Sequence, residues 1–259
     1  MPDKEVLQMH PYKGKLIVLE GLDGIGKGTQ ELAIKEFFSA EGKKVFDIKN
    51  HWTHYHFHPQ FDSTLKKYYI DMNSFDVLIL SEPTYVGAGR SIREEAICDN
   101  GRRYSALSTA QLYALDRLVL DKRVTLPALN AGKIVVKSRS VVSSLVYQPV
   151  QAQERGEKLT IEDVLALEGN QFSMKHSPNI LVIATIKNPE DLMKRLAQRE
   201  KKDDAIFENI EFQLKIKPHY ESEWLRKLFE KEGTRVEYLD AGISVESTKE
   251  QVVRIVKGV

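Results

Sequence analysis

The chain has 259 residues and carries 38 Lys and Arg against 37 Asp and Glu, so its formal net charge is +1 at pH 7. This balance gives no electrostatic reason to expect nucleic acid or a membrane as a partner, and no apolar run approaches the roughly 18 residues of a membrane-spanning helix. The single cysteine, Cys98, and an N-terminus without the apolar segment of a signal peptide predict a cytoplasmic location.

The first predicted strand, at 16–20, runs into a glycine-rich loop that reads Gly-Leu-Asp-Gly-Ile-Gly-Lys-Gly-Thr over 21–29, and a helix follows at 29–40. Glycines let a backbone wrap around an anion, and the helix N-terminus adds partial positive charge. The pattern predicts a phosphate-binding loop in which Lys27 contributes a full charge. Gly28 stands where G-x-x-x-x-G-K-[ST] has its Mg²⁺-binding hydroxyl. Asp23 is either a turn residue in water or a contact to a sugar, metal or cation.

Strand and helix patterns alternate along the rest of the chain. Strands are predicted at 44–48, 76–80, 133–137, 180–185 and 236–239. Helices are predicted at 108–130, with a break or kink at Pro127, and at 206–232. Three further helices are predicted from their starting signals: a capping box at 160–163, Asn188 with the proline after it, and a cap at 247–250. Apolar strands separated by helices predict a three-layer α/β/α fold with a mostly parallel sheet of about five strands. Ligands bind such folds at the carboxyl ends of the strands.

Residues 50–75 form an insertion-like segment between two predicted strands. Four histidines, His51, His54, His56 and His58, fall within eight residues, and three of them would share one face of an extended chain. That spacing permits a metal site. Because aromatic residues alternate with the histidines and no acid or cysteine lies among them, we favour an aromatic-rich structural or substrate-side insertion and keep metal binding as the alternative.

Two sets of residues in the middle of the chain are candidates for ligand binding. Glu82-Pro83-Thr84 follows a predicted strand, and Arg90 and Arg93 come shortly after it, where their planar guanidinium groups suit a phosphate or a carboxylate. Tyr113 and Arg117 share a helix face, which suits stacking on a base and binding its edge. Solvated surface arginines and ordinary helix packing are the alternative interpretations.

Two later groups follow other strands. Hydroxyl and amide side chains after the strand at 133–137 suit a nucleoside, although they also suit a plain polar loop. These residues are Ser138, Arg139, Ser140, Ser143, Ser144, Tyr147 and Gln148. Farther on, Arg195 and Arg199 belong to a basic cluster that either closes over transferring phosphates or forms a solvated helix end.

In this order the motifs resemble the thymidylate kinase family of P-loop nucleoside monophosphate kinases, over about residues 15–220. The resemblance rests on the residues 20–27, 82–84, Gly89, 92–93, 112–117, 127–129, Gly132, Arg139, 143–148, Arg195, Arg199, Asp203, Glu208 and Tyr220. It implies an enzyme that phosphorylates dTMP to dTDP with ATP and Mg²⁺. It also implies homodimers, and one kinase domain over 1–259 with an insertion at about 50–75 and a lid at about 195–206.

The resemblance also implies a role for each matching residue. The ATP site would comprise Gly21, Asp23, Gly24, Ile25, Gly26, Lys27, Gly28 and Thr29. The nucleoside monophosphate would contact Asp23, Glu82, Arg93, Tyr113, Arg117, Arg139, Ser144 and Tyr147. Lys27, Arg139, Arg195 and Arg199 would act in catalysis, the last two from the lid. No residue need act as nucleophile, because the acceptor phosphate attacks.

Four positions depart from the family pattern. Gly28 and Ser138 replace a hydroxyl and an acid that help to place Mg²⁺, so the metal ligands are not identified from the sequence. Ser140 replaces an aromatic residue, and Asp204 replaces a lid arginine. These changes leave two alternatives to a dTMP kinase. One is a kinase for a different nucleotide or nucleoside acceptor, and the other is a nucleotide-binding regulator with weak catalysis.

Overall fold

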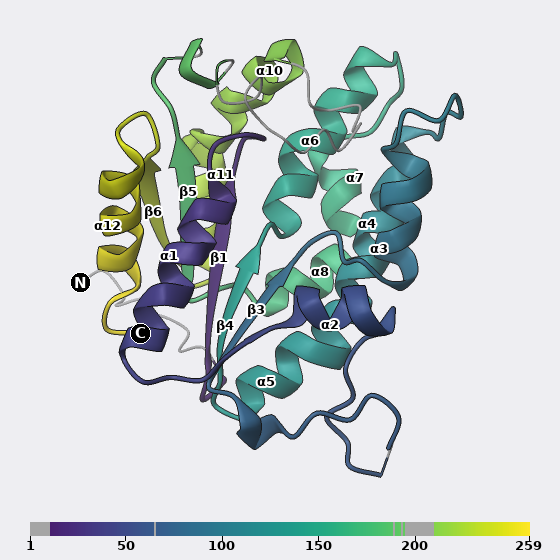
Figure 1. Cartoon of the computed structure of the whole chain (residues 1–259). Helices are drawn as coiled ribbons and strands as arrows, with labels where there is room; N and C mark the ends of the chain where they lie inside the picture. Colours follow the sequence, from purple (N-terminus) through teal and green to yellow (C-terminus); the bar gives the residue numbers. More distant parts are fainter. Residues whose placement is uncertain (1–10, 65, 189, 193, 195–209) are drawn as a thin grey trace, which may run out of the picture.

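The computed structural model describes residues 11–64, 66–188, 190–192, 194 and 210–259. They form a three-layer α/β structure around a six-stranded sheet in the order β2-β3-β4-β1-β5-β6, in which every neighbouring pair is parallel (Figure 1). The strands are β1 Lys15–Gly21, β2 Val45–Asp47, β3 Val77–Ser81, β4 Ile134–Ser138, β5 Ile180–Thr185 and β6 Arg235–Asp240. The parallel α/β class is confirmed, and β2 is a three-residue strand at the sheet edge.

The helices connect these strands. They are α1 Lys27–Ala40, α2 Ile48–Tyr55, α3 Gly87–Ser91, α4 Ala106–Leu120, α5 Leu126–Asn130, α6 Val141–Glu154, α7 Ile161–Ala166, α8 Glu168–Lys175, α10 Ile210–Tyr220, α11 Glu223–Lys231 and α12 Val245–Val256. In Figure 1, α1 and α12 pack side by side in front of the sheet and α11 lies behind it. In the described part of the chain, no helix combines the length and apolarity needed to cross a membrane.

The predicted strands lie where the sequence placed them, to within about one residue at each end. In β3 the four residues from Val77 to Leu80 are buried, as expected for a strand covered by helices on both faces. The helix pattern at 108–130 is interrupted as predicted near Pro127. Between α4 and α5 the chain makes a π-helical turn at Asp121–Thr125, where the Leu126 amide bonds the Asp121 carbonyl. This wider turn accommodates a proline that has no N–H to donate.

Two predictions about helix ends need correction. The pattern at 206–232 is not one helix in the described residues from 210 onward, because Ser222 caps a new helix, α11, by accepting the Leu225 amide proton. The last helix is capped by Ser244, which accepts from the Ser247 amide, so Ser247 lies inside the first turn. Both serines fit a capping pattern, and the chain uses the earlier one. The capping box at Thr160 is confirmed.

The histidine-rich segment packs as an aromatic cluster. Trp52 is fully buried, and its indole Nε1 donates to His58 Nδ1 at 3.2 Å. Burial lowers the pKa of His58 to about 4, so this ring is neutral at pH 7. His51 lies against Phe46 and Tyr55. Among the described residues, no group of three or more His, Cys, Asp or Glu side chains is arranged to hold a metal ion, and the structure favours the packing interpretation.

Three central strands bring the chemical motifs to one edge of the sheet. The residue pairings Leu19↔Ser138 and Ser81↔Ser138 align the carboxyl ends of β1, β4 and β3. The glycine-rich loop leaves β1, the segment 82–86 leaves β3, and Arg139 follows β4. This convergence is the topology that places ligands at the strand ends of a parallel sheet.

Candidate functional site

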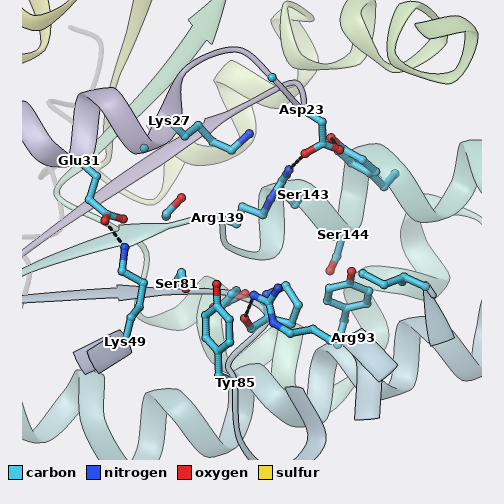
Figure 2. Close-up of a pocket in the computed structure, with 18 of the residues that line it drawn as sticks. Asp23, Lys27, Glu31, Lys49, Ser81, Tyr85, Arg93, Arg139, Ser143 and Ser144 are labelled. Carbon is cyan, nitrogen blue, oxygen red and sulfur yellow. Dashed lines mark hydrogen bonds and ion pairs between the residues drawn. The ribbon is translucent and has the colours of Figure 1, made fainter. Parts of the chain in front are cut away.

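A cavity of about 710 Å³ lies at this edge of the sheet (Figure 2). The predicted site residues that line it are Asp23, Gly24, Gly26, Lys27, Gly28, Thr29, Glu82, Arg93, Tyr113, Arg139, Ser144 and Tyr147. Gly21, Ile25 and Arg117 are not part of the lining. Arg195 and Arg199, and with them the proposed lid, lie outside the described residues.

The glycine-rich loop has the backbone of an anion site. Gly21 has φ +133°, and a Cβ there would lie 2.6 Å from the Ala184 carbonyl oxygen, so only glycine fits. Gly26 has φ +100° and precedes α1 without a side-chain cap, so no side chain caps the N-terminus of this helix, which faces the cavity. Lys27 Nζ donates to the carbonyls of Gly21 at 2.9 Å and Leu22 at 2.7 Å. The loop therefore places backbone N–H groups, a helix N-terminus and the Lys27 ammonium group beside the same cavity.

Arg139 is held at the centre of the cavity. Its backbone has φ +71°, and its amide bonds the Leu19 carbonyl at 2.9 Å. The guanidinium donates to the Asp23 carboxylate and to Ser143 Oγ, the latter at 3.0 Å. Burial acts against the charge of Arg139, but the Asp23 carboxylate raises its pKa above the usual value, so the group stays cationic. Tyr147 also donates to Asp23, at 3.0 Å, and thus helps to fix the carboxylate.

Arg93 forms the lower wall of the cavity in Figure 2. It donates to the carbonyl of Thr84 at 3.1 Å and to that of Pro83 at 2.6 Å, and its guanidinium lies 4.0 Å from the ring centre of Tyr85. Its carbonyl partners are neutral, so its full charge is available to an anion. Arg90, in contrast, points to solvent and pairs with Glu94.

Asp116 fixes the backbone that holds Arg93. Its carboxylate accepts from the Thr84 amide at 2.8 Å and from Thr84 Oγ1 at 2.7 Å. Burial raises the pKa of Asp116 to about 6, although the bonds from Thr84 work in the opposite direction. The geometry of the segment 82–84 thus depends on a buried carboxylate.

Behind the cavity lies a buried ionic network centred on Glu82. Arg117 Nε donates to Glu82 Oε2 at 2.8 Å, and Lys137 Nζ lies 2.9 Å from Glu82 Oε1 and 3.0 Å from Asp121 Oδ1. The carboxylates raise the pKa of Lys137 even though burial opposes its charge. A buried charge is tolerated when it is paired in this way.

Arg117 lies in this network instead of in the cavity lining. Its remaining nitrogens donate to Asn170, to the Ser140 carbonyl at 3.0 Å and to Ser144 Oγ at 3.0 Å. Of these partners, Ser144 lines the cavity. Arg117 therefore orients Ser144 from behind, which its position on a helix face could not reveal.

Helices α4 and α6 contribute an aromatic residue, Tyr113, and an amide, Gln148, to the cavity lining. Burial raises the pKa of Tyr113 to about 12, so its hydroxyl is neutral at pH 7. Gln148 Nε2 donates to Ser144 Oγ at 3.2 Å, while its Oε1 is buried without a hydrogen-bond partner in the described part of the chain. An aromatic ring and an amide with an unpartnered acceptor in the same lining suit a flat heterocycle with an N–H group.

Five lining residues belonged to no predicted site or motif: Glu31, Lys49, Ser81, Tyr85 and Ile97. Glu31 and Lys49 form an ion pair on the left of Figure 2. Both had usable signals in the sequence. Glu31 is one helical turn beyond Lys27, and Lys49 follows a predicted strand whose carboxyl end meets the same edge of the sheet.

The cavity lining contains oxygen atoms of the kind that act as ligands for Mg²⁺. This ion prefers carboxylates and phosphates and keeps several waters. Asp23, Glu31 and Glu82 line the cavity, and Ser81 Oγ is buried without a hydrogen-bond partner among the residues described. Such a donor set suits a hydrated ion bound jointly with phosphates.

Known proteins resemble this chain in sequence and in fold. The family model described as thymidylate kinase matches residues 60–252. A thymidylate kinase of Caldicellulosiruptor saccharolyticus is 30% identical over 204 residues, which cover 79% of this chain and 80% of the relative. A probable thymidylate kinase of Pyrococcus abyssi is 29% identical over 249 residues, 95% of this chain and 97% of the relative. The solved structure of a thymidylate kinase from Candida albicans shares the fold, with a TM-score of 0.62 and 17% identity, over 94% of this chain and 91% of that one.

Proposed function

Since the chain belongs to the thymidylate kinase family, we propose that it transfers the γ-phosphate of ATP to dTMP and releases ADP and dTDP. The observation that carries this proposal is the convergence of Lys27, Arg93 and Arg139 on one cavity. Three cations beside a phosphate-binding loop can contact the phosphates of both substrates. The aromatic and amide groups of α4 and α6 match a nucleobase.

In the proposed reaction, an oxygen of the dTMP phosphate attacks the γ-phosphorus while the bond to the β,γ-bridging oxygen breaks. The protein contributes position and charge, not a nucleophile. The loop amides and Lys27 hold the ATP phosphates, and Arg93 and Arg139 hold the acceptor phosphate. Asp23 keeps Arg139 in place through the ion pair described above. Mg²⁺ bound to the ATP phosphates would neutralise further charge, and oxygen donors of the lining, Asp23 among them, would hold its waters.

Residues of α4 and α6 would recognise the base. We assign stacking on thymine to Tyr113 and contact with the polar edge of the base to Ser144 and Gln148. The open Oε1 of Gln148 can accept the N3–H of thymine. Arg117 contributes through Ser144 and Glu82, the two lining residues that it bonds. Tyr147 contributes through Asp23.

The remaining parts of the proposal rest on the family resemblance. Arg195 and Arg199, in a lid at about 195–206 of a single kinase domain, would close over the transferring phosphate. A homodimer would form through α4, and the exposed Leu107 and Leu115 on that helix supply an apolar surface for it. Light scattering of the purified chain tests the dimer. The cytoplasmic location stays a prediction.

An acceptor panel tests the substrate. Purified protein is assayed with ATP, Mg²⁺ and one acceptor at a time from dTMP, dUMP, dCMP, dGMP, AMP and thymidine. We expect the highest kcat/KM for dTMP, the acceptor that the family membership implies. The Gln148 amide would select thymine and uracil over the other bases, and contact with the thymine methyl group would add about 1–3 kcal/mol of selection against dUMP. A higher kcat/KM for a non-thymidine acceptor would replace dTMP in the proposal. Binding of ATP without any product would favour the regulator alternative.

A further inference from the structure

Glu31 and Lys49 form a charged pair on the cavity wall that the proposed reaction does not yet use. Glu31 lies in the second turn of α1, and Lys49 lies in the first turn of α2, the helix that follows the edge strand. Their side chains are 11% and 28% exposed, so the pair is partly shielded from water. Figure 2 shows it on the side of the cavity that faces α1, near Ser81 and Tyr85.

The position of Glu31 on α1 relates it directly to the phosphate loop. It follows Gly28 by three residues and therefore shares a helix face with it. Side chains on a helix tilt toward its N-terminus, so the Glu31 carboxylate reaches back toward Gly28. A Cβ at Gly28 would meet no atom within 4 Å, which shows open space at that position. Phosphate loops of this type have a Mg²⁺-binding hydroxyl there, and this chain has none.

Glu31 differs from the other two carboxylates of the lining in what holds it. Asp23 is bound by Arg139, Tyr147 and Gln213 together. Glu82 is buried between Arg117 and Lys137, and removing a partner from such a buried pair is costly. Glu31 forms its ion pair with the Lys49 ammonium, which lies on a flexible stem and can be displaced by another cation, and Lys35 adds a weaker attraction.

We infer that Glu31 orients the hydrated magnesium ion of MgATP, and that Lys49 leaves Glu31 for a phosphate oxygen when this complex binds. The inference rests on the ATP half of the proposed function. Both charges keep an opposite partner throughout the exchange: the carboxylate trades an ammonium for a divalent cation, and the ammonium trades a carboxylate for a phosphate. Burial raises the pKa of Glu31, so its charged form needs a cation beside it in either state.

The test measures the coupling between magnesium and nucleotide. The affinity for a β,γ-imido analogue of ATP is determined by calorimetry with Mg²⁺ and with EDTA. The dissociation constant in EDTA divided by the one in Mg²⁺, called the magnesium ratio below, reports how much magnesium strengthens binding. For Glu31→Gln we expect this ratio to fall by about tenfold. The matched control is Glu36→Gln on the exposed side of the same helix, and there the ratio should stay at the wild-type value.

Lys49→Met separates the two halves of the inference. Without the ammonium, we expect weaker binding of the analogue in EDTA and an undiminished magnesium ratio, because Glu31 is still present. If both Glu31→Gln and Lys49→Met lower the melting temperature and leave the magnesium ratio at its wild-type value, the pair is structural and the inference is wrong. A wild-type protein that shows the coupling yet does not phosphorylate dTMP would refute the proposed acceptor and leave this inference standing.

Discussion

Asp23 and Arg139 show how single side chains organise the cavity. They are 116 residues apart in the chain and meet as an ion pair at the ends of two neighbouring strands. Asp23 balances the charge of Arg139 and also accepts from Tyr147 and Gln213. The cation is thereby positioned before a phosphate arrives, which reduces the reorganisation that binding requires.

Arg93 and Arg90 form a matched pair for testing the acceptor-phosphate site. Arg93→Met should raise the KM for dTMP by about 10- to 100-fold, because a hydrogen bond between charged groups contributes about 1.5–3 kcal/mol. Arg90→Met removes an arginine one turn away whose partner is Glu94 at the surface. Its KM should stay within about twofold of wild type. Steady-state kinetics with dTMP as the varied substrate measure both, and equal effects would show that Arg93 does not hold the acceptor.

Asp116 predicts a pH dependence of stability. Its pKa in the folded chain, about 6, lies above its ordinary value of 3.8 because of burial. A raised pKa in the folded state gives stability that is full below about pH 3.8 and is lost as the pH rises through about 6. Over that window the wild type should lose stability relative to Asp116→Asn. Urea unfolding of both proteins at several pH values measures the difference, and a constant difference would contradict the assignment.

At the scale of whole elements, the strands were predictable and the helix ends were less so. β1, β3, β4 and β5 are short apolar runs buried on both faces, a pattern that needs no knowledge of the rest of the fold. The split between α10 and α11 depends on Ser222, a single cap inside a charged helical pattern. Local composition favours one long helix there, and packing against the sheet selects two.

The N-cap of α12 can be tested by comparing the stability effects of removing Ser244 and Ser247. Ser244→Ala should destabilise the protein by about 1 kcal/mol, because Ser244 Oγ accepts the Ser247 amide. Ser247→Ala, at the position that the sequence pattern favours, should change stability by less than about 0.5 kcal/mol. Chemical denaturation of the two variants decides between the caps. A larger effect at Ser247 would restore the original prediction.

The candidate site was predictable where its residues follow strands in the sequence. The loop at 21–29, Glu82 and Arg139 were found because the carboxyl ends of parallel strands meet at one edge. The Glu31–Lys49 pair was missed although the position of each residue gave a signal, because the pair joins two helices and neither residue belongs to a known motif. Arg117 was found, but its place behind the cavity depends on Asn170 and Ser144, partners that no local pattern indicates.

At the scale of the whole molecule, the strand order β3-β4-β1 brings the loop, the segment 82–86 and Arg139 around one cavity. Helices α1 and α2 close one side of it, and α4 and α6 close the other. In the proposed function, this arrangement puts the groups assigned to the phosphates near the sheet and the groups assigned to the base between helices. The proposed function therefore requires phosphate transfer within this cavity.

The most direct test follows labelled phosphate from γ-³²P-ATP into dTDP, with wild type and with Lys27→Ala side by side. We expect labelled dTDP from the wild type and a rate at least about 100-fold lower for Lys27→Ala. Unchanged thermal unfolding of the variant would show that the fold is intact. Transfer by Lys27→Ala at the wild-type rate, or no labelled dTDP from the wild type, would contradict the proposed function.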